Sequence, residues 1–241
     1  MKFYNFGDFI KPGMYNSPMV KKSSYSIYNK KQNDLKVVSK LDELYPPLPK
    51  EKFDIIYADP PWDYGGKMQF DKSGKSEHNK DWQKDIFISS ASFKYPTLKL
   101  NELKSLDVPS ISSDDCLLFM WTSNPHLSQS IDLAKSWGFE YRTVAFVWDK
   151  MVHNPGQYTL SYCELCLLFK KGRIPKPRGA RNIKQLLHEK RGAHSAKPIQ
   201  IRKNIHEMFP TQKKIELFAR SGDNKWSTWG YTHDKSSDDM F

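Results

Sequence analysis

Phe53-Asp-Ile-Ile-Tyr-Ala58 runs directly into Asp59-Pro-Pro-Trp62, and this stretch decides the fold. The first six residues are mostly apolar on both faces, which is typical of a strand buried inside a parallel sheet. The strand must end at Asp59, because neither Pro60 nor Pro61 has an N–H group for the ladder of hydrogen bonds. In open α/β sheets, ligands bind beyond the carboxyl ends of the strands. The stretch from Asp59 to Trp62 is therefore a candidate binding edge.

Around this stretch, short apolar runs alternate with segments of helical spacing. The runs predict strands, and the helical segments carry apolar residues on one face. The predicted strands cover residues 116–121, 143–148, 162–169 and 214–219, and the predicted helices cover 101–106, 125–137 and 198–209. This alternation predicts an α/β fold with a mostly parallel sheet covered by helices on both faces.

The segments outside this pattern set the expected domain limits. Residues 1–48 are rich in Lys, Ser, Asn and Tyr and predict an irregular, basic N-terminal extension. The α/β domain is expected over residues 49–233, with a polar loop at about 64–93 and a flexible tail at 234–241.

The charge balance bounds the class of protein. The chain has 241 residues and carries 38 Lys and Arg against 27 Asp and Glu, a formal net charge of +11. Positive potential favours polyanionic partners such as nucleic acid, although charge alone does not establish one. No run approaches the ~18 apolar residues of a membrane span, and the N-terminal residues are too polar for a secretory signal. We expect an intracellular protein without membrane contacts.

The cysteines and histidines do not predict a metal site. Cys163 and Cys166 have the C-x-x-C spacing, but they lie in the apolar run from Tyr162 to Phe169. If that run is a strand, residues three apart point to opposite faces and cannot meet at one ion. The seven histidines show no spacing typical of metal ligands. Packed thiols and no bound metal are expected.

Several further motifs follow one another in a fixed order. They are Ala58-Asp-Pro-Pro-Trp62, Tyr95-Pro-Thr-Leu98, Asp115-Cys-Leu-Leu-Phe-Met-Trp121, Trp137-Gly-Phe139, Phe146-Val-Trp148, His194-Ser-Ala-Lys-Pro198, Glu216-Leu-Phe-Ala-Arg220 and Trp229-Gly230. In content and order they resemble the MT-A70 family of adenine-N6 methyltransferases, over about residues 53 to 230. The resemblance implies a Rossmann-like domain that uses S-adenosyl-L-methionine (SAM), with the catalytic motif ahead of the strand from Glu216 to Arg220. It also implies a nucleic-acid substrate.

The chemistry of adenine methylation suits the residues from Asp59 to Trp62. The amino nitrogen of adenine is a poor nucleophile, because its lone pair is delocalised into the ring. The Asp59 carboxylate and the Pro60 carbonyl can accept its two hydrogens and hold it in line with the methyl group. Pro60 and Pro61 fix the backbone that carries these acceptors. Trp62 offers a face on which an extruded adenine can stack.

The resemblance also assigns residues to the cofactor. Lys197 would contact the methionine carboxylate, Arg220 the region of the ribose, and Phe218 the wall of the pocket. The full set is Asp34, Leu35, Asp59, Lys197, Phe218, Arg220 and Asn224. The family commonly continues after Trp-Gly with Asn and an acid or amide that grip the ribose. This chain instead has Tyr231 and Thr232, so those ribose contacts are not carried over.

Basic residues supply candidates for substrate binding. The segment from Lys170 to Arg181 is dense in Lys and Arg with Gly and Pro, which favours an adaptable phosphate-binding loop over a solvated linker. With Trp62, the predicted substrate residues are Tyr64, Arg178, Arg181, Lys190 and Arg191.

Alternatives stay open at this point. The Asp-Pro-Pro-Trp turn could simply end a strand with a packed indole. RNA would be methylated by the same residues. DNA is favoured because the chain has no recognisable RNA-binding module, and family members of this size are mostly prokaryotic or phage DNA enzymes. The family also contains inactive partner subunits, so a homodimer or a heterodimer is conceivable. The expected location is the cytoplasm of a prokaryotic or phage-infected cell, or the nucleus in a eukaryote.

Overall fold

The computed structural model describes residues 40–63, 96–154, 158–192, 196–219 and 225–230. The chain divides into two units, residues 1–37 and 38–241, and every described residue lies in the second. Most of the predicted N-terminal extension, the polar loop and the tail therefore lie outside the described residues.

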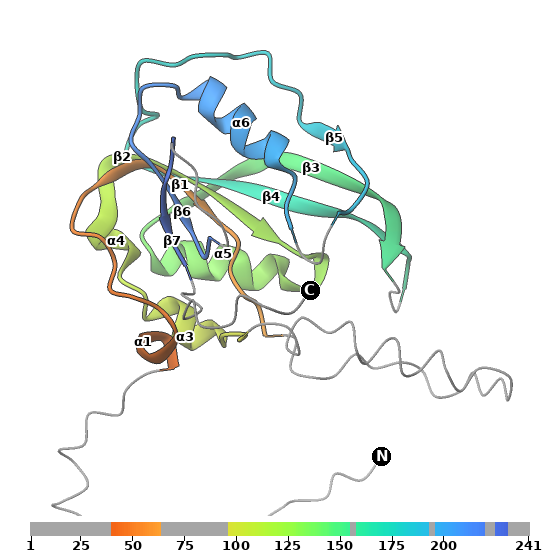
Figure 1. The fold of residues 1–241 in the computed structure, drawn as a ribbon, viewed down its shortest axis with the longest axis horizontal. Coiled ribbons are helices and arrows are strands. Elements are labelled where there is room, and N and C mark those ends of the chain that lie inside the picture. Colours follow the sequence, from red (N-terminus) through yellow and green to blue (C-terminus); the bar gives the residue numbers. More distant parts are fainter. Residues whose placement is uncertain (1–39, 64–95, 155–157, 193–195, 220–224, 231–241) are drawn as a thin grey trace, which may run out of the picture. The chain divides into compact units, whose positions relative to one another are not determined.

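A mixed sheet forms the centre of the domain (Figure 1). Among the described residues it has seven strands in the order β5-β3-β4-β2-β1-β6-β7. Their bounds are β1 Phe53–Ala58, β2 Ser112–Thr122, β3 Glu140–Asn154, β4 Ser161–Lys171, β5 Leu186–His188, β6 Lys214–Leu217 and β7 Ser227–Trp229. Strand β1 pairs in parallel with β2 and with β6, and β4 pairs antiparallel with both of its neighbours. The remaining strands run parallel to one another, so the predicted Rossmann-like, mostly parallel α/β sheet is confirmed.

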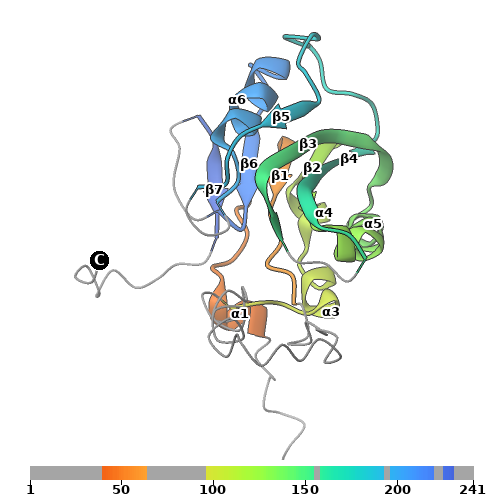
Figure 2. The same cartoon turned by 90° about the vertical axis from the view of Figure 1, so that its right-hand side faces the viewer.

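Helices cover both faces of the sheet, as expected (Figure 2). The helices are α1 Lys40–Leu44, α3 Leu100–Lys104, α4 Val108–Ile111, α5 Leu127–Ser136 and α6 Ile199–Met208, and the 3₁₀ turn η2 Asn124–His126 precedes α5. One core cluster joins α1, α3, α4 and α5 to residues such as Ile56 and Leu118. A second joins α6 to Ile55 and Phe119, the neighbours of those residues along β1 and β2. Neighbouring strand residues point to opposite faces, so a continuous apolar run contributes side chains to both core clusters.

Some elements differ from the sequence-based expectation. Strands β3 and β4 form an antiparallel hairpin, which no crossover helix separates. The short elements α1, α4, β5 and β7 were not predicted, because three to five residues carry too little periodicity to be recognised. Within the segment predicted to be irregular, α1 buries Leu41, and Tyr45 is buried just after it. The strand predicted over 214–219 ends at Leu217, because Phe218 has a positive φ of 61°.

The two closely spaced cysteines point to opposite faces of β4, as predicted. Cys166 lies opposite Trp121 and Phe146 and is buried in the cluster beneath α6. Cys163 lies opposite Asp149 and is partly exposed. Burial raises the pKa of the Cys166 thiol well above its ordinary value, and it raises the pKa of Cys116 to about 12. Both buried thiols are therefore protonated at neutral pH.

Among the described residues, none of the helices has the length and hydropathy of a membrane span.

Two glycines with positive φ give a test of the fold. Gly138 (φ 82°) follows α5 and has open space where a Cβ would stand, whereas a Cβ on Gly172 (φ 62°), after β4, would collide with the Asp114 carbonyl. Gly138→Ala should lower the free energy of unfolding by about 1–2 kcal/mol through left-handed strain alone. Gly172→Ala should cost more, because the backbone of β2 must also shift. Urea unfolding midpoints measure both, and equal losses would contradict the steric argument.

Candidate active site

The turn from Asp59 to Trp62 leaves the carboxyl end of β1, in the middle of the sheet. The Asp59 N–H donates to the Leu217 carbonyl at 3.5 Å, which extends the pairing with β6 by one residue. The Trp62 N–H then donates to Pro60 O, and the Leu98 N–H donates to Pro61 O, each at 2.9 Å. The turn is therefore fixed to two separate segments of the chain. The carboxyl ends of β2, β3, β6 and β7 and the start of β4 meet at this same edge.

Four charged side chains alternate in sign at this edge. Lys197 Nζ lies 2.8 Å from Asp59 Oδ1 and 3.4 Å from Glu164 Oε2, while Lys150 Nζ lies 3.4 Å from Glu164 Oε1. Lys150 is almost fully buried, and the other three side chains are 16–22% exposed. Partly buried charges of alternating sign hold one another in position, since each would be costly to leave unpaired.

Aromatic side chains lie beneath these charges. The Lys197 ammonium lies 5.6 Å from the ring centroid of Trp121, close enough for a cation–π contact. The Trp121 indole N–H donates to the Tyr57 hydroxyl at 2.6 Å. Burial, with Cys166 next in importance, raises the pKa of Tyr57 well above its ordinary value, so the phenol stays neutral. The Lys197 ammonium thus lies between acidic side chains and the uncharged ring of Trp121.

Trp62 is a packed indole with one stacked face. Its ring lies 5.4 Å from that of His126 at an interplanar angle of 16°, and its N–H donates to the Trp121 carbonyl at 3.4 Å. His126 Nδ1 lies 2.8 Å from Ser123 Oγ. Burial lowers the pKa of His126, although Asp63 acts in the opposite direction. His126 is therefore mainly a neutral aromatic support for the turn from Asp59 to Trp62.

Phe218 begins a second aromatic group at the same edge. Its ring makes edge contacts with Tyr45 at 5.6 Å and with Trp229 at 5.4 Å, and the latter two rings stack at 4.9 Å. The Trp229 indole N–H donates to the Pro46 carbonyl at 2.8 Å. The residue predicted to line the cofactor pocket thus lies directly after β6, next to the strand that carries Asp59.

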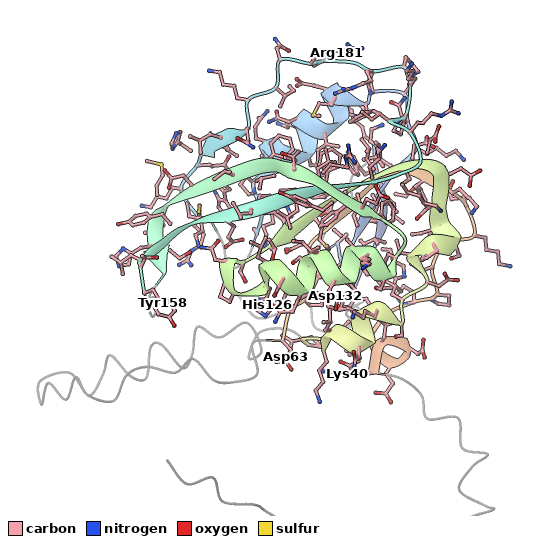
Figure 3. The ribbon with its side chains drawn as sticks, turned by 180° about the vertical axis from the view of Figure 1, so that it is seen from behind. Lys40, Asp63, His126, Asp132, Tyr158 and Arg181 are labelled. Atoms are coloured by element: carbon pink, nitrogen blue, oxygen red, sulfur yellow. The ribbon has the colours of Figure 1, made fainter. Side chains whose placement is uncertain are left out.

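The structure separates the predicted basic residues into two locations. Lys190 and Arg191 follow β5, and the Arg191 N–H donates to the carbonyl of Lys150, so this pair lies at the same edge as Asp59. Arg178 lies over the Phe209 ring at 5.3 Å, at the far end of α6. Figure 3 likewise shows Arg181 at the end of the domain opposite Asp63 and His126. A helix of this length spans about 15 Å, so of these four basic residues only Lys190 and Arg191 lie at the edge with Asp59.

Other predicted positions lie outside the described residues. These are Asp34, Leu35, Tyr64, Arg220 and Asn224, together with Tyr231 and Thr232. Conversely, sequence reasoning missed Glu164, Lys150 and the support given by His126. A lone acid in the apolar run of β4 was the available signal for Glu164, since a charge in a buried strand needs a partner. Lys150 gave no such signal.

The chain is similar in sequence to a known protein family and to several known proteins. The model of the MT-A70 family matches residues 53–232. The chain is 62% identical over 210 residues to the type II methyltransferase M.MunI of a Mycoplasma species, which covers 87% of this chain and 90% of that protein. It is 27% identical to a Drosophila melanogaster N(6)-adenosine-methyltransferase MT-A70-like protein and 25% identical to the human N(6)-adenosine-methyltransferase catalytic subunit METTL3. Each of these matches covers 70% of this chain but only about a quarter of the longer protein, 24% and 26% respectively.

The family match agrees with the mostly parallel sheet. The chain belongs to the MT-A70 family and is a methyltransferase whose methyl donor is SAM.

Proposed function

We propose that the protein transfers a methyl group from SAM to the N6 amino group of adenine in DNA. The observation that carries the proposal is the Asp59 carboxylate, fixed by Lys197 at 2.8 Å, at the start of a proline-held turn. An amino group needs acceptors of this kind, in a fixed orientation, to become a competent nucleophile.

The charged groups at the edge fit the cofactor. The methionine part of SAM carries a carboxylate and an ammonium, and Lys197 and Asp59 offer one charge of each complementary sign. We propose that Lys197 contacts the carboxylate and that Phe218 lines the pocket beside β6, with Asp34, Leu35, Arg220 and Asn224 completing it. SAM supplies a methyl group already activated on sulfonium sulfur.

The residues from Asp59 to Trp62 would position the adenine. A carboxylate has two oxygens with about four lone-pair sites, so its bond to Lys197 does not exhaust the capacity of Asp59 to accept an amino hydrogen. Pro60 O already accepts the Trp62 N–H, but a carbonyl has a second lone pair for the other hydrogen. Trp62 is only 7% exposed and stacks on His126, so its indole would form a rigid wall beside the base rather than an open stacking face.

Two observations favour DNA over RNA and over an inactive partner subunit. A relative that this chain matches over nearly its whole length is named a type II methyltransferase, unlike the relatives named N(6)-adenosine-methyltransferases, of which the chain covers only about a quarter. The Asp-Pro-Pro-Trp turn and its lysine partner are intact, which an inactive scaffold does not require. Lys190 and Arg191, at the catalytic edge, are proposed to contact phosphates. Arg178 and Arg181 stay predictions for more distant contacts.

Transfer of labelled methyl from SAM tests the reaction directly. Native duplex DNA, the same DNA denatured by heat, and RNA are incubated in parallel and then digested to nucleosides. We expect N6-methyladenine from DNA. Label in RNA alone would replace the DNA proposal, and SAM binding without any labelled product would favour the partner subunit.

Removing the charge at the catalytic turn should stop the reaction. In Asp59→Asn, an acceptor oxygen becomes an NH₂ donor, so kcat should fall by roughly 100-fold or more. Asp132→Asn, on the exposed face of α5, is the matched control and should keep full activity. Single-turnover rates and thermal midpoints separate a chemical defect from unfolding. Full activity in Asp59→Asn would remove the proposed mechanism.

Loss of the Lys197 charge should weaken cofactor binding. A charge-assisted hydrogen bond contributes about 1.5–3 kcal/mol, so the Kd for SAM in Lys197→Gln should rise roughly 10- to 100-fold. Lys213→Gln, which alters an exposed lysine paired with Glu51 at the opposite edge of the sheet, should leave the Kd unchanged. Isothermal titration measures both. An unchanged Kd in Lys197→Gln would assign this lysine to Asp59 alone.

A further inference from the structure

Several apolar side chains near the end of the β3–β4 hairpin are exposed to solvent. Isolated exposed apolar residues are ordinary on protein surfaces, but a group of them marks an interaction site. Tyr158 is 91% exposed, the highest value among the large apolar residues that the structure describes. The group comprises Met151, Val152, Tyr158, Leu160 and Tyr162. Core packing does not account for these side chains.

The backbone at this end is bent by an irregular register. Asp149 lies opposite Cys163, and Asn154 lies opposite Ser161, so β3 advances five residues while β4 advances two. Met151 lies inside this irregularity with φ 57°, a left-handed conformation that a residue with a side chain rarely adopts. Such bulges redirect side chains and are frequent beside active sites. The hairpin end therefore does not continue the regular register of β3 and β4.

The hairpin end belongs to the catalytic side of the domain. It continues from the carboxyl end of β3, where Lys150 bonds Glu164, and Glu164 in turn bonds Lys197. Figure 3 shows Tyr158 at the end of the domain where His126 and Asp63 lie, with Arg181 at the opposite end. The hairpin end and Asp59 therefore lie on the same side of the domain.

Positive charge borders the apolar group. Asp149 Oδ1 accepts the Met151 N–H at 2.9 Å, and its Oδ2 lies 2.9 Å from His188 Nδ1 on β5. Exposed Lys190 and Arg191 follow β5 after one acidic residue, Glu189. The Asp149 carboxylate thus joins the bulge at Met151 to His188 at the end of β5. Apolar side chains beside positive charge suit a surface that enters a stack of bases while it holds the phosphates.

We propose that the β3–β4 hairpin end, led by Tyr158 and Leu160, inserts into duplex DNA at the target base pair and holds the duplex open. This inference rests on the proposed action on DNA. In a duplex, the N6 amino group is paired and stacked, so the adenine must leave the helix before it can reach Asp59. An apolar wedge offsets the lost stacking.

Permanganate reactivity of thymine tests the insertion without knowledge of the target sequence. Permanganate attacks a thymine that has lost its stacked and paired neighbour, so plasmid DNA with bound protein should show reactive thymines at the sites of binding. The Tyr158→Ser/Leu160→Ser protein should lower this reactivity at least roughly tenfold and lower kcat/KM on native plasmid to a similar extent. Its Kd for SAM should stay unchanged. Tyr141→Ser, a partly exposed tyrosine at the other end of β3, is the matched control.

The outcomes separate this inference from the proposed function. Equal thymine reactivity in the double variant and the wild type, or none in the wild type, would overturn insertion. A change of oligomeric state in the double variant, measured by sedimentation, would overturn it in favour of a second copy of the chain as the occupant. If the wild type exposes thymines yet never yields N6-methyladenine, the proposed reaction fails while the insertion stands.

Discussion

The absence of N–H groups on Pro60 and Pro61 is the constraint on which the site depends. It ends β1 while β2, on one side of it, continues for two further residues beyond the last paired position. The chain must leave the sheet at its centre, and the freed carbonyls take the Trp62 and Leu98 N–H groups instead. The carboxylate of Asp59 therefore stands on a backbone that has little freedom to turn. A glycine-rich turn here would leave the same carboxylate without a fixed direction.

Electrostatics then sets the orientation of the side chains. Asp59, Lys197, Glu164 and Lys150 together carry no net charge. Their side chains can therefore be partly buried at this edge of the sheet. Such pairs contribute little net stability, because desolvation offsets their attraction. Their effect is geometric, since each charge restricts the next. Lys197 is thus held in place by two acids, Asp59 and Glu164.

Much of the fold was predictable because its signals are local. The buried run of β1 and the prolines after it needed no distant information, and the same holds for α5 and α6, whose apolar spacing is regular. The direction of β4 was not predictable, since an apolar strand reads alike in either direction. The pairing of Lys197 with Asp59 was missed because 138 positions of chain separate two residues that each carried a predicted role. The separation of Arg178 from Lys190 depends on where α6 begins and ends.

The antiparallel direction of β4 means that one connection between strands needs no covering helix. Every parallel strand must return to the amino edge through a covering segment, whereas β3 and β4 turn directly at the carboxyl edge. Residues 151–154 and 158–160, the described part of this turn, contribute nothing to either core cluster, so a change in the length of the turn would not remove a core contact with the helices. The length of this turn can therefore vary without a change in the charged groups Asp59, Lys197, Glu164 and Lys150.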